Sequence, residues 1–534
     1  MTPGASGDFT LLALGATELL AGRLLRYQDQ PGFQMATFAE SYDEKAATAA
    51  DARKALGANL ALISALEQHD NRWRARLELR EPARGRSLGT RVVDVPVTEP
   101  FAFADSLYHG ALALLRLPAG AHTAESDFGV RGAGTLRFLM QGVGRRRAAP
   151  SADDRRRAIE DFETACRTEP GAATPRMWLA SAELGQYAAT KDSSWLARAE
   201  ASARAAVSLD GGRAGPHRTL ASVLGYRKRH AEALAEYERA CALDPTDDEA
   251  WHLWGRTWLR LGKPEEERKV YEAAIARRPH CYKPRWWLAA WYFYNGHFGE
   301  AKQAYREMIR CAPDLATGYA SLGGLLVLDG EYDRALDTLR LAAMLRPTAV
   351  SYVNLGTAYF NSGRLDQSVE AYNQAFQFGE ANYHLWYDLG EAYFWLRGRP
   401  DQARDAYRQA LRVGREEIAA RAGRGSSVDP MIPANLATLL PKLGEPDTAR
   451  IMLADALAAD SLNAMVQYCA ALTCWQLGER DRALDWLRRA VAGGYPVVWL
   501  RDSPVHREWR GNPRFDSLLA GAPSKSGTAP SPGK

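Results

Sequence analysis

A period of 34 residues governs most of this 534-residue chain. From about residue 214 to residue 495, a small residue recurs at steps of 34, 34, 34, 33, 34, 47 and 34 residues. The residues in this series are Ala221, Gly255, Ala289, Gly323, Gly356, Gly390, Ala437 and Ala471. This period is typical of a solenoid of helix–turn–helix units, in which each unit buries its apolar face against its neighbours. The period therefore predicts a long array with an extended binding surface, and it does not name the partner.

The unit at 248–279 shows how each repeat is built. Trp251 opens an apolar stripe with helical spacing, and Gly262 ends that helix because a residue without Cβ tolerates positive φ. Tyr271 belongs to the inner face of a second helix, which Pro279 ends because proline cannot continue the hydrogen-bond ladder. Trp251 and Tyr271 are therefore expected in the core.

Later units carry the same residue types at the same offsets. Two of them contain Tyr352, Leu355, Gly356, Tyr359, Gly363, Ser368, Tyr372 and Ala375, then Trp386, Leu389, Gly390, Tyr393, Ala403, Tyr407 and Ala410. This pattern resembles the tetratricopeptide repeat (TPR) family. The resemblance implies a mainly α protein, a TPR α-solenoid of about ten helix–turn–helix repeats.

The repeat pattern also predicts where the array weakens and stops. The expected order is degenerate repeats at 133–212, regular repeats at 213–411, an insertion at 412–429 with an extended helix and a Gly/Ser loop, further repeats at 430–495, a cap over the last apolar face at 496–520 and a disordered tail at 521–534.

The first 120 residues follow another pattern. Alternating apolar residues predict strands near 33–38, 60–66, 73–79 and 92–97, and helical stretches are expected at 10–27, 45–56 and 101–117. The pattern predicts a small α/β sheet domain over 1–120, joined to the repeats by a linker at 121–132.

Three segments of this domain carry a second resemblance. They are GATELL from Gly15, ARKALGA from Ala52 and DNRWRARLEL from Asp70, and they resemble the TolB-like amino-terminal domain of bacterial regulators. The whole layout resembles the carboxy-terminal half of bacterial eukaryotic-like serine/threonine kinases, with the kinase domain absent. The strand that precedes the opening helix in the TolB-like family is missing, and we therefore expect that the reading frame starts late or that the chain is a fragment of a longer polypeptide.

No catalytic constellation is visible in the sequence. Asp127, Phe128 and Gly129 form the metal-binding tripeptide of kinases, but no HRD loop, glycine-rich loop or strand lysine precedes it. Walker A, HExxH and GxSxG motifs are absent, so we expect no enzyme, no cofactor and no metal site.

The composition of the chain bears on which kinds of partner and compartment we expect. A net charge of +4 gives no support for a nucleic-acid partner, and no apolar run is long enough for a membrane helix. The six cysteines form no CxxC pair, which favours buried free thiols. We expect a cytoplasmic chain, or an extracytoplasmic one if it belongs to a longer membrane-anchored kinase; its oligomeric state is open.

The TPR resemblance also implies a binding groove, because positions 2, 5, 6, 9, 12 and 13 of each first helix face the concave side in that family. These positions hold His252, Arg256, Arg260, Lys283, Trp286, Trp287, Phe293, Tyr294, Asn354, Thr357, Phe360, Asn361, Tyr387, Asp388, Glu391, Phe394 and Trp395. Exposed aromatic residues supply contact area to a peptide or protein ligand at low entropic cost. The alternative is that these rings tighten the packing between adjacent first helices.

Two functions therefore remain open. The first is a non-catalytic scaffold or adaptor in bacterial signalling, which binds a peptide or partner protein in the concave groove. The second is the regulatory or sensory half of a serine/threonine kinase whose catalytic domain is truncated or encoded upstream. A self-contained enzyme that uses the α/β domain is a third reading, for which no site is visible.

Overall fold

The computed structural model describes residues 7–28, 30, 33, 35–36, 48–56, 58–120, 123–148, 151–379, 381–396, 398–423 and 427–520. The chain divides into two units, Met1–Leu288 and Ala289–Lys534. The boundary falls within helix α14 (Tyr282–Tyr294). The expected tail at 521–534 lies outside the described residues. So does most of the strand expected near 33–38, of which Phe33, Met35 and Ala36 are described and belong to no strand.

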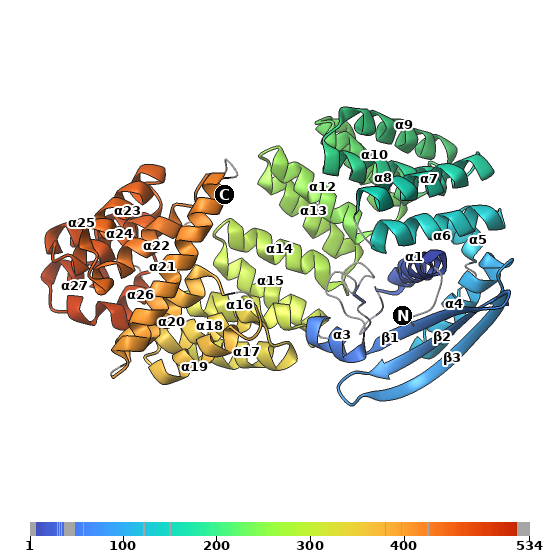
Figure 1. Ribbon diagram of the computed structural model, residues 1–534. Coiled ribbons are helices and arrows are strands. Elements are labelled where there is room, and N and C mark those ends of the chain that lie inside the picture. The colour runs from blue at the N-terminus through green and yellow to red at the C-terminus, as the bar shows by residue number, and fades with distance from the viewer. Residues whose placement is uncertain are drawn as a thin grey trace. The chain divides into compact units, whose positions relative to one another are not determined.

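Unit 1 contains a three-stranded antiparallel sheet in the order β1-β2-β3 near its amino-terminal end (Figure 1). Its strands are β1 (Ala61–His69), β2 (Arg72–Glu81) and β3 (Arg86–Pro96). Along β2, Trp73, Ala75 and Leu77 are buried at alternate positions because successive side chains of a strand point to opposite faces. Helix α4 (Pro100–Leu115) packs against β2 and β3 on that side. The small α/β sheet at the amino-terminal end is confirmed.

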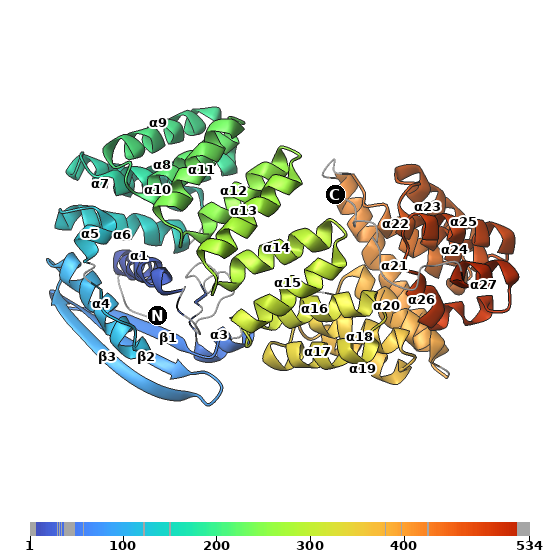
Figure 2. The same ribbon diagram turned by 180° about the vertical axis from the view of Figure 1, so that it is seen from behind.

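Helix α1 (Gly7–Leu24) contacts β1, α4 and α6 (Ala133–Ala148), and it lies between the sheet and α6 in both ribbon views (Figures 1 and 2). The α1–α6 crossing depends on two glycines. A Cβ added at Gly15 would lie 1.8 Å from the Met140 carbonyl oxygen, and one added at Gly144 would lie 1.8 Å from the Leu11 carbonyl oxygen. Backbone therefore meets backbone where the sheet domain joins the first helices of the array.

The remaining helices of unit 1 are mostly antiparallel pairs. They are η1 (Leu25–Tyr27), α3 (Ala49–Leu56), α5 (Ala124–Phe128), α7 (Ala152–Thr168), α8 (Ala173–Thr190), α9 (Ser193–Leu209), α10 (Ala214–Tyr226), α11 (His230–Leu243), α12 (Asp248–Arg260) and α13 (Pro264–Arg277). Within a pair the helices pack closely, and first helices of successive pairs also touch, as α8 touches α10 and α10 touches α12.

Unit 2 continues the same architecture. Its helices after α14 are α15 (Phe298–Cys311), α16 (Ala316–Leu328), α17 (Tyr332–Leu345), α18 (Ala349–Asn361), α19 (Leu365–Ala375), α20 (Tyr383–Trp395), α21 (Pro400–Gly423), α22 (Met431–Leu439), η2 (Pro441–Leu443), α23 (Pro446–Ala459), α24 (Ala464–Gln476), α25 (Arg480–Ala492), α26 (Val497–Asp502), η3 (Pro504–Trp509) and α27 (Pro513–Ala520). The mainly α solenoid of repeated helix pairs is therefore confirmed.

The recurring glycines have two structural roles. Gly262 and Gly363 end first helices with φ of 69° and 76°, which only glycine adopts without strain. Gly356 sets the distance between the helices of one pair, because a Cβ there would lie 2.5 Å from the ring of Tyr372. Trp251 and Tyr271 are buried, as predicted.

Two further properties concern the described residues as a set. None of the helices in the described part of the chain is both long enough and apolar enough to cross a membrane. All six cysteines are free thiols, and all but the partly exposed Cys311 are buried. Burial raises the pKa of Cys166 to about 11, so this thiol stays protonated at neutral pH.

Candidate partner-binding surface

In unit 1 one predicted groove residue of α12, His252, is in direct contact with one of α14, Trp287. The His252 ring stacks on Trp287 with ring centroids 5.1 Å apart, and Tyr271 lies against the same indole at 5.6 Å. His252 and Trp287 are therefore only half-exposed, and their contact holds one first helix beside the next. Burial, and then the nearby Arg256 guanidinium, lowers the pKa of His252, which favours the neutral imidazole.

Three residues of this face project toward solvent. Arg256 and Arg260 are exposed on α12, and the side chain of Trp286 on α14 is 41% exposed. Lys283 does not join them, because it is buried with its Nζ 3.5 Å from Asp248 Oδ2. We therefore correct the prediction for Lys283: its ammonium is held by a carboxylate inside the unit.

Two aromatic residues, Tyr226 and Tyr187, were not among the groove residues predicted from the sequence. Tyr226 is 50% exposed at the end of α10, and its ring meets Tyr187 edge-on at 5.9 Å. Tyr226 lies 34 residues before Arg260 and so occupies the equivalent register position. The register alone could have identified it. Tyr187 belongs to a degenerate repeat, in which the register is harder to read.

In unit 2, three predicted aromatic residues are accessible to different degrees. Tyr294 is 61% exposed and Phe394 is 46% exposed, whereas Phe293 is half-buried between Tyr294 and Phe298, with ring centroids 5.4 Å and 5.7 Å away. Large rings with this much exposure are available for contact with another molecule.

The acidic residues of α20 lie in a polar cluster. Glu391 accepts a hydrogen bond of 2.7 Å from the Tyr407 hydroxyl and is ion-paired with Lys442, whose Nζ lies 4.4 Å from the centre of the Phe394 ring. Tyr387 accepts a 3.0 Å hydrogen bond from Thr438. Glu391 is buried, so the prediction that it faces a ligand is wrong: its charge is neutralised within the unit.

Asp388 lies beside this cluster and is partly exposed. Burial, and then repulsion from Glu391, raises the pKa of Asp388 to about 7. Trp395 is also partly exposed and donates its indole N–H to Glu391 at 3.3 Å.

The predicted groove residues of α18 differ from one another in exposure. Asn354 and Thr357 are partly exposed, and the Thr357 hydroxyl lies 3.2 Å from that of Tyr372. Phe360 and Asn361 are buried. The prediction of an open surface is therefore corrected for Phe360 and Asn361.

The segment 497–509, here called the C-terminal strap, reaches back to these repeats. The Trp499 indole donates a 3.3 Å hydrogen bond to the Val327 carbonyl at the end of α16, and a Cβ at Gly330 would lie 2.4 Å from Val498 Cγ2. Val505 packs against the apolar cluster that contains Phe360. The strap thus contacts the end of α16 and the apolar cluster in which Phe360 is buried.

The end of the strap also covers the last repeat. Trp509 stacks on Trp475 with centroids 3.9 Å apart, and Phe515 packs into the same cluster. The cap expected from the sequence at 496–520 includes these residues and stays a prediction. The return to Val327, 172 residues earlier, was not anticipated.

The Asp127 side chain of the Asp-Phe-Gly tripeptide is bound by arginines of the same chain. The carboxylate of Asp127 accepts hydrogen bonds from Arg23 at 2.6 Å and Arg26 at 3.0 Å, and Arg23 also pairs with Asp105 at 2.9 Å. Asp127 therefore ties α5 to α1. No group of three or more His, Cys, Asp or Glu that could hold a metal ion occurs among the residues that the structure describes.

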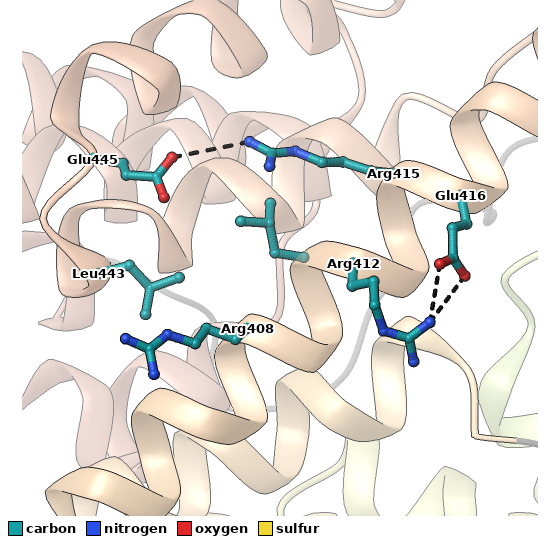
Figure 3. Close-up of a pocket in the computed structure, with 7 residues that line it drawn as sticks. Arg408, Arg412, Arg415, Glu416, Leu443 and Glu445 are labelled. Atoms are coloured by element: carbon teal, nitrogen blue, oxygen red, sulfur yellow. Dashed lines mark hydrogen bonds and ion pairs between the residues drawn. The ribbon is translucent and has the colours of Figure 1, made fainter.

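A hollow of about 450 Å³ opens beside α21 in unit 2 (Figure 3). Arg408, Arg412 and Arg415 line it, together with Glu416 and Glu445. Arg412 bonds to Glu416 at 2.9 Å, and Arg415 lies 3.9 Å from Glu445. The paired charges and the open shape give this hollow no clear ligand chemistry.

Comparison with known proteins agrees with the repeat. Family models described as Tetratricopeptide repeat match residues 347–416 and 214–257, and one described as Tetratrico peptide repeat matches residues 392–499. No curated protein matches the sequence.

Several solved structures resemble the chain. The Cut9–Hcn1 hetero-tetramer of the APC/C is 18% identical, with 79% of this chain and 82% of that chain covered and a TM-score of 0.37. A tetratricopeptide repeat protein from Parabacteroides merdae is 18% identical, with coverages of 49% and 99% and a TM-score of 0.33. YrrB, described as a TPR protein with an unusual peptide-binding site, is 18% identical, with coverages of 37% and 94% and a TM-score of 0.26.

Proposed function

We propose that this chain is a non-catalytic scaffold that binds a peptide or a partner protein along the first helices of its repeats. The observation that supports the proposal most strongly is the exposure of large aromatic side chains at groove positions. Trp286, Tyr294 and Phe394 are 41%, 61% and 46% exposed, although each is large enough to have filled a core. Such rings are enriched among the residues that dominate binding energy at protein interfaces.

The proposed binding surface contains fewer residues than the sequence predicted, because some of the predicted groove residues are buried. Lys283, Phe360, Asn361 and Glu391 are buried and are left out of it. The proposed contacts are Arg256, Arg260 and Trp286 in unit 1, and Tyr294 and Phe394 in unit 2. Each unit is proposed to contribute its own part of the surface.

The test is affinity purification of partners with full-length variants. Trp286→Ala combined with Tyr294→Ala should remove the partner that the wild-type chain recovers, because truncation of a central aromatic contact typically costs about 2 kcal/mol or more in binding. Met344→Ala combined with Leu462→Ala is the matched control, since these residues are 73% and 85% exposed and lie outside the predicted groove positions. Circular dichroism verifies folding. Equal recovery by both double variants would contradict the proposal.

We also propose that the scaffold serves bacterial signalling, as the regulatory half of a kinase or beside one. The support is the resemblance of three sequence segments to the TolB-like domain, together with the order of α1, the β1–β3 sheet and α4. The coding DNA upstream of Met1 provides the test. An in-frame kinase domain supports the proposal, and an unrelated coding sequence or a stop codon in frame speaks for a free-standing scaffold.

A further inference from the structure

We propose that the α12–α14 face of unit 1 binds an acidic segment of the partner, with Arg256 and Arg260 as the residues that contact its carboxylates. This inference rests on the proposed function and adds the chemistry of the partner to it.

Arg256 and Arg260 are placed to act together. They are four residues apart on α12, so their side chains leave the same face of the helix. Both are exposed, and neither side chain makes an ion pair or a hydrogen bond with any residue in the described ranges. A guanidinium group presents a rigid fork of donors that pairs bidentately with a carboxylate.

The nearby charged residues that the structure describes make no ion pair with these two arginines. One repeat earlier, Arg218 is held by Asp247 at 2.8 Å and by Glu249, so its charge is neutralised. The Glu267 carboxyl near Arg256 is buried and makes no ion pair with it; burial raises the pKa of Glu267, and the 2.9 Å hydrogen bond from Tyr271 and then the Arg256 charge oppose that rise. His252 on the same face favours its neutral form. A carboxylate from outside the chain would supply the missing counter-charge.

Aromatic residues flank the two arginines. Tyr226 is equivalent to Arg260 in the 34-residue register, and α10 touches α12. Trp286 follows on α14, which the His252–Trp287 stack holds beside α12. Exposed rings on both sides of two cations suit a peptide that carries acidic and apolar side chains together.

A nucleic acid offers the same negative charge but fits this surface less well. Non-specific nucleic-acid binding needs a row of cations that tracks successive phosphates. Here the row is interrupted on both sides, because Arg218 and Lys283 are already paired with carboxylates. Two free guanidinium groups match a short acidic stretch of polypeptide.

The experiment measures fluorescence anisotropy with the full-length chain and three labelled probes. The first is a short peptide of glutamates and phenylalanines, the second has lysine at each glutamate position, and the third is oligothymidine of the same length. The acidic peptide should bind about tenfold or more tightly than the lysine peptide. Its binding should also weaken between about 50 mM and about 500 mM NaCl, because salt screens exposed charges.

The key variant is Arg256→Ala combined with Arg260→Ala. It should weaken binding of the acidic peptide about tenfold or more, because two charge-assisted contacts are lost. Arg156→Ala combined with Arg157→Ala removes the same charge from α7, where both arginines are exposed and paired with Asp153. This control should bind within about twofold of the wild-type chain.

Four results would overturn the inference. They are no binding of the acidic peptide, equal binding of the two peptides, tighter binding of oligothymidine, and equal loss in the two double variants. If the wild-type chain binds both peptides equally and Trp286→Ala abolishes that binding, the proposed function stands. Only the proposed acidic chemistry of the partner is then refuted. Failure of the proposed function itself appears separately, as unchanged partner recovery in the purification experiment.

Discussion

Single glycine residues allow helix backbones to come into contact in this chain, as Gly15 and Gly144 do where α1 crosses α6. Gly15 and Gly144 bring two helix backbones together, so any side chain there meets a carbonyl oxygen that cannot rotate away. The sequence marks Gly15 only as part of a resemblance. The structure supplies the physical reason, which is contact between two helices more than 100 residues apart in the chain.

Gly144→Ala should therefore destabilise unit 1 by about 3 kcal/mol, at the upper end for overpacking, because the added Cβ meets backbone rather than a flexible side chain. Urea unfolding followed by circular dichroism measures the change. Gly22→Ala is the matched control on α1, since nothing lies within 4 Å of a Cβ there. It should be neutral or should stabilise by up to about 1 kcal/mol through helix propensity. A wild-type midpoint for Gly144→Ala would refute the crossing.

Burial also explains which site residues the sequence could predict. The 34-residue register placed Arg256, Trp286 and Phe394 correctly on exposed positions. It could not foresee the burial of Lys283, because the Asp248 carboxylate that holds this side chain comes from the preceding repeat. The 34-residue register predicts on which side of the helix a side chain lies. It does not predict which other residues of the protein contact that side chain.

At the scale of elements, the C-terminal strap is the main departure from a regular repeat array. The sequence pattern predicts a cap in this region, and Trp509 and Phe515 pack in the apolar cluster of the last repeat. Its return to Val327 leaves no local signature in the sequence, because that contact depends on how several intervening repeats curve. The strap gives unit 2 a long-range contact that nearest-neighbour packing alone does not provide.

The strap carries a pH-sensitive residue, His506. The His506 ring is fully buried and is stacked with the Phe515 ring. Its Nε2 lies 3.1 Å from the Tyr468 hydroxyl. Burial lowers the pKa of His506 to about 3. The unfolded chain has an ordinary histidine pKa near 6.5, so it gains a proton below that pH while the folded chain does not.

The free energy of unfolding should therefore fall as the pH drops below about 6.5, by roughly 2 kcal/mol at pH 5 from this residue. Above about pH 6.5 both states are neutral, and His506 contributes no pH dependence. In His506→Gln, which cannot titrate, that part of the loss should disappear. Urea unfolding of both proteins at pH 7.5 and pH 5 provides the comparison. The same loss in both would show that other groups cause it.

At the scale of the whole molecule, the chain is a sheet domain followed by repeated helix pairs in two units. The period predicted this class of fold because every repeat must bury one face against the next. Nothing in the local sequence pattern indicates that the strap returns to Val327. The central claim is that the exposed first-helix positions, and not the exposed positions of the second helices, contact the partner.

Site-specific photo-crosslinking tests this claim most directly. A photoreactive phenylalanine analogue is placed at Trp286 in one variant and at Ile451 in another, because Ile451 is 63% exposed on the second helix α23. We predict that the partner recovered by the wild-type chain crosslinks at position 286 and does not crosslink at position 451. Crosslinking at 451 with none at 286 would contradict the account.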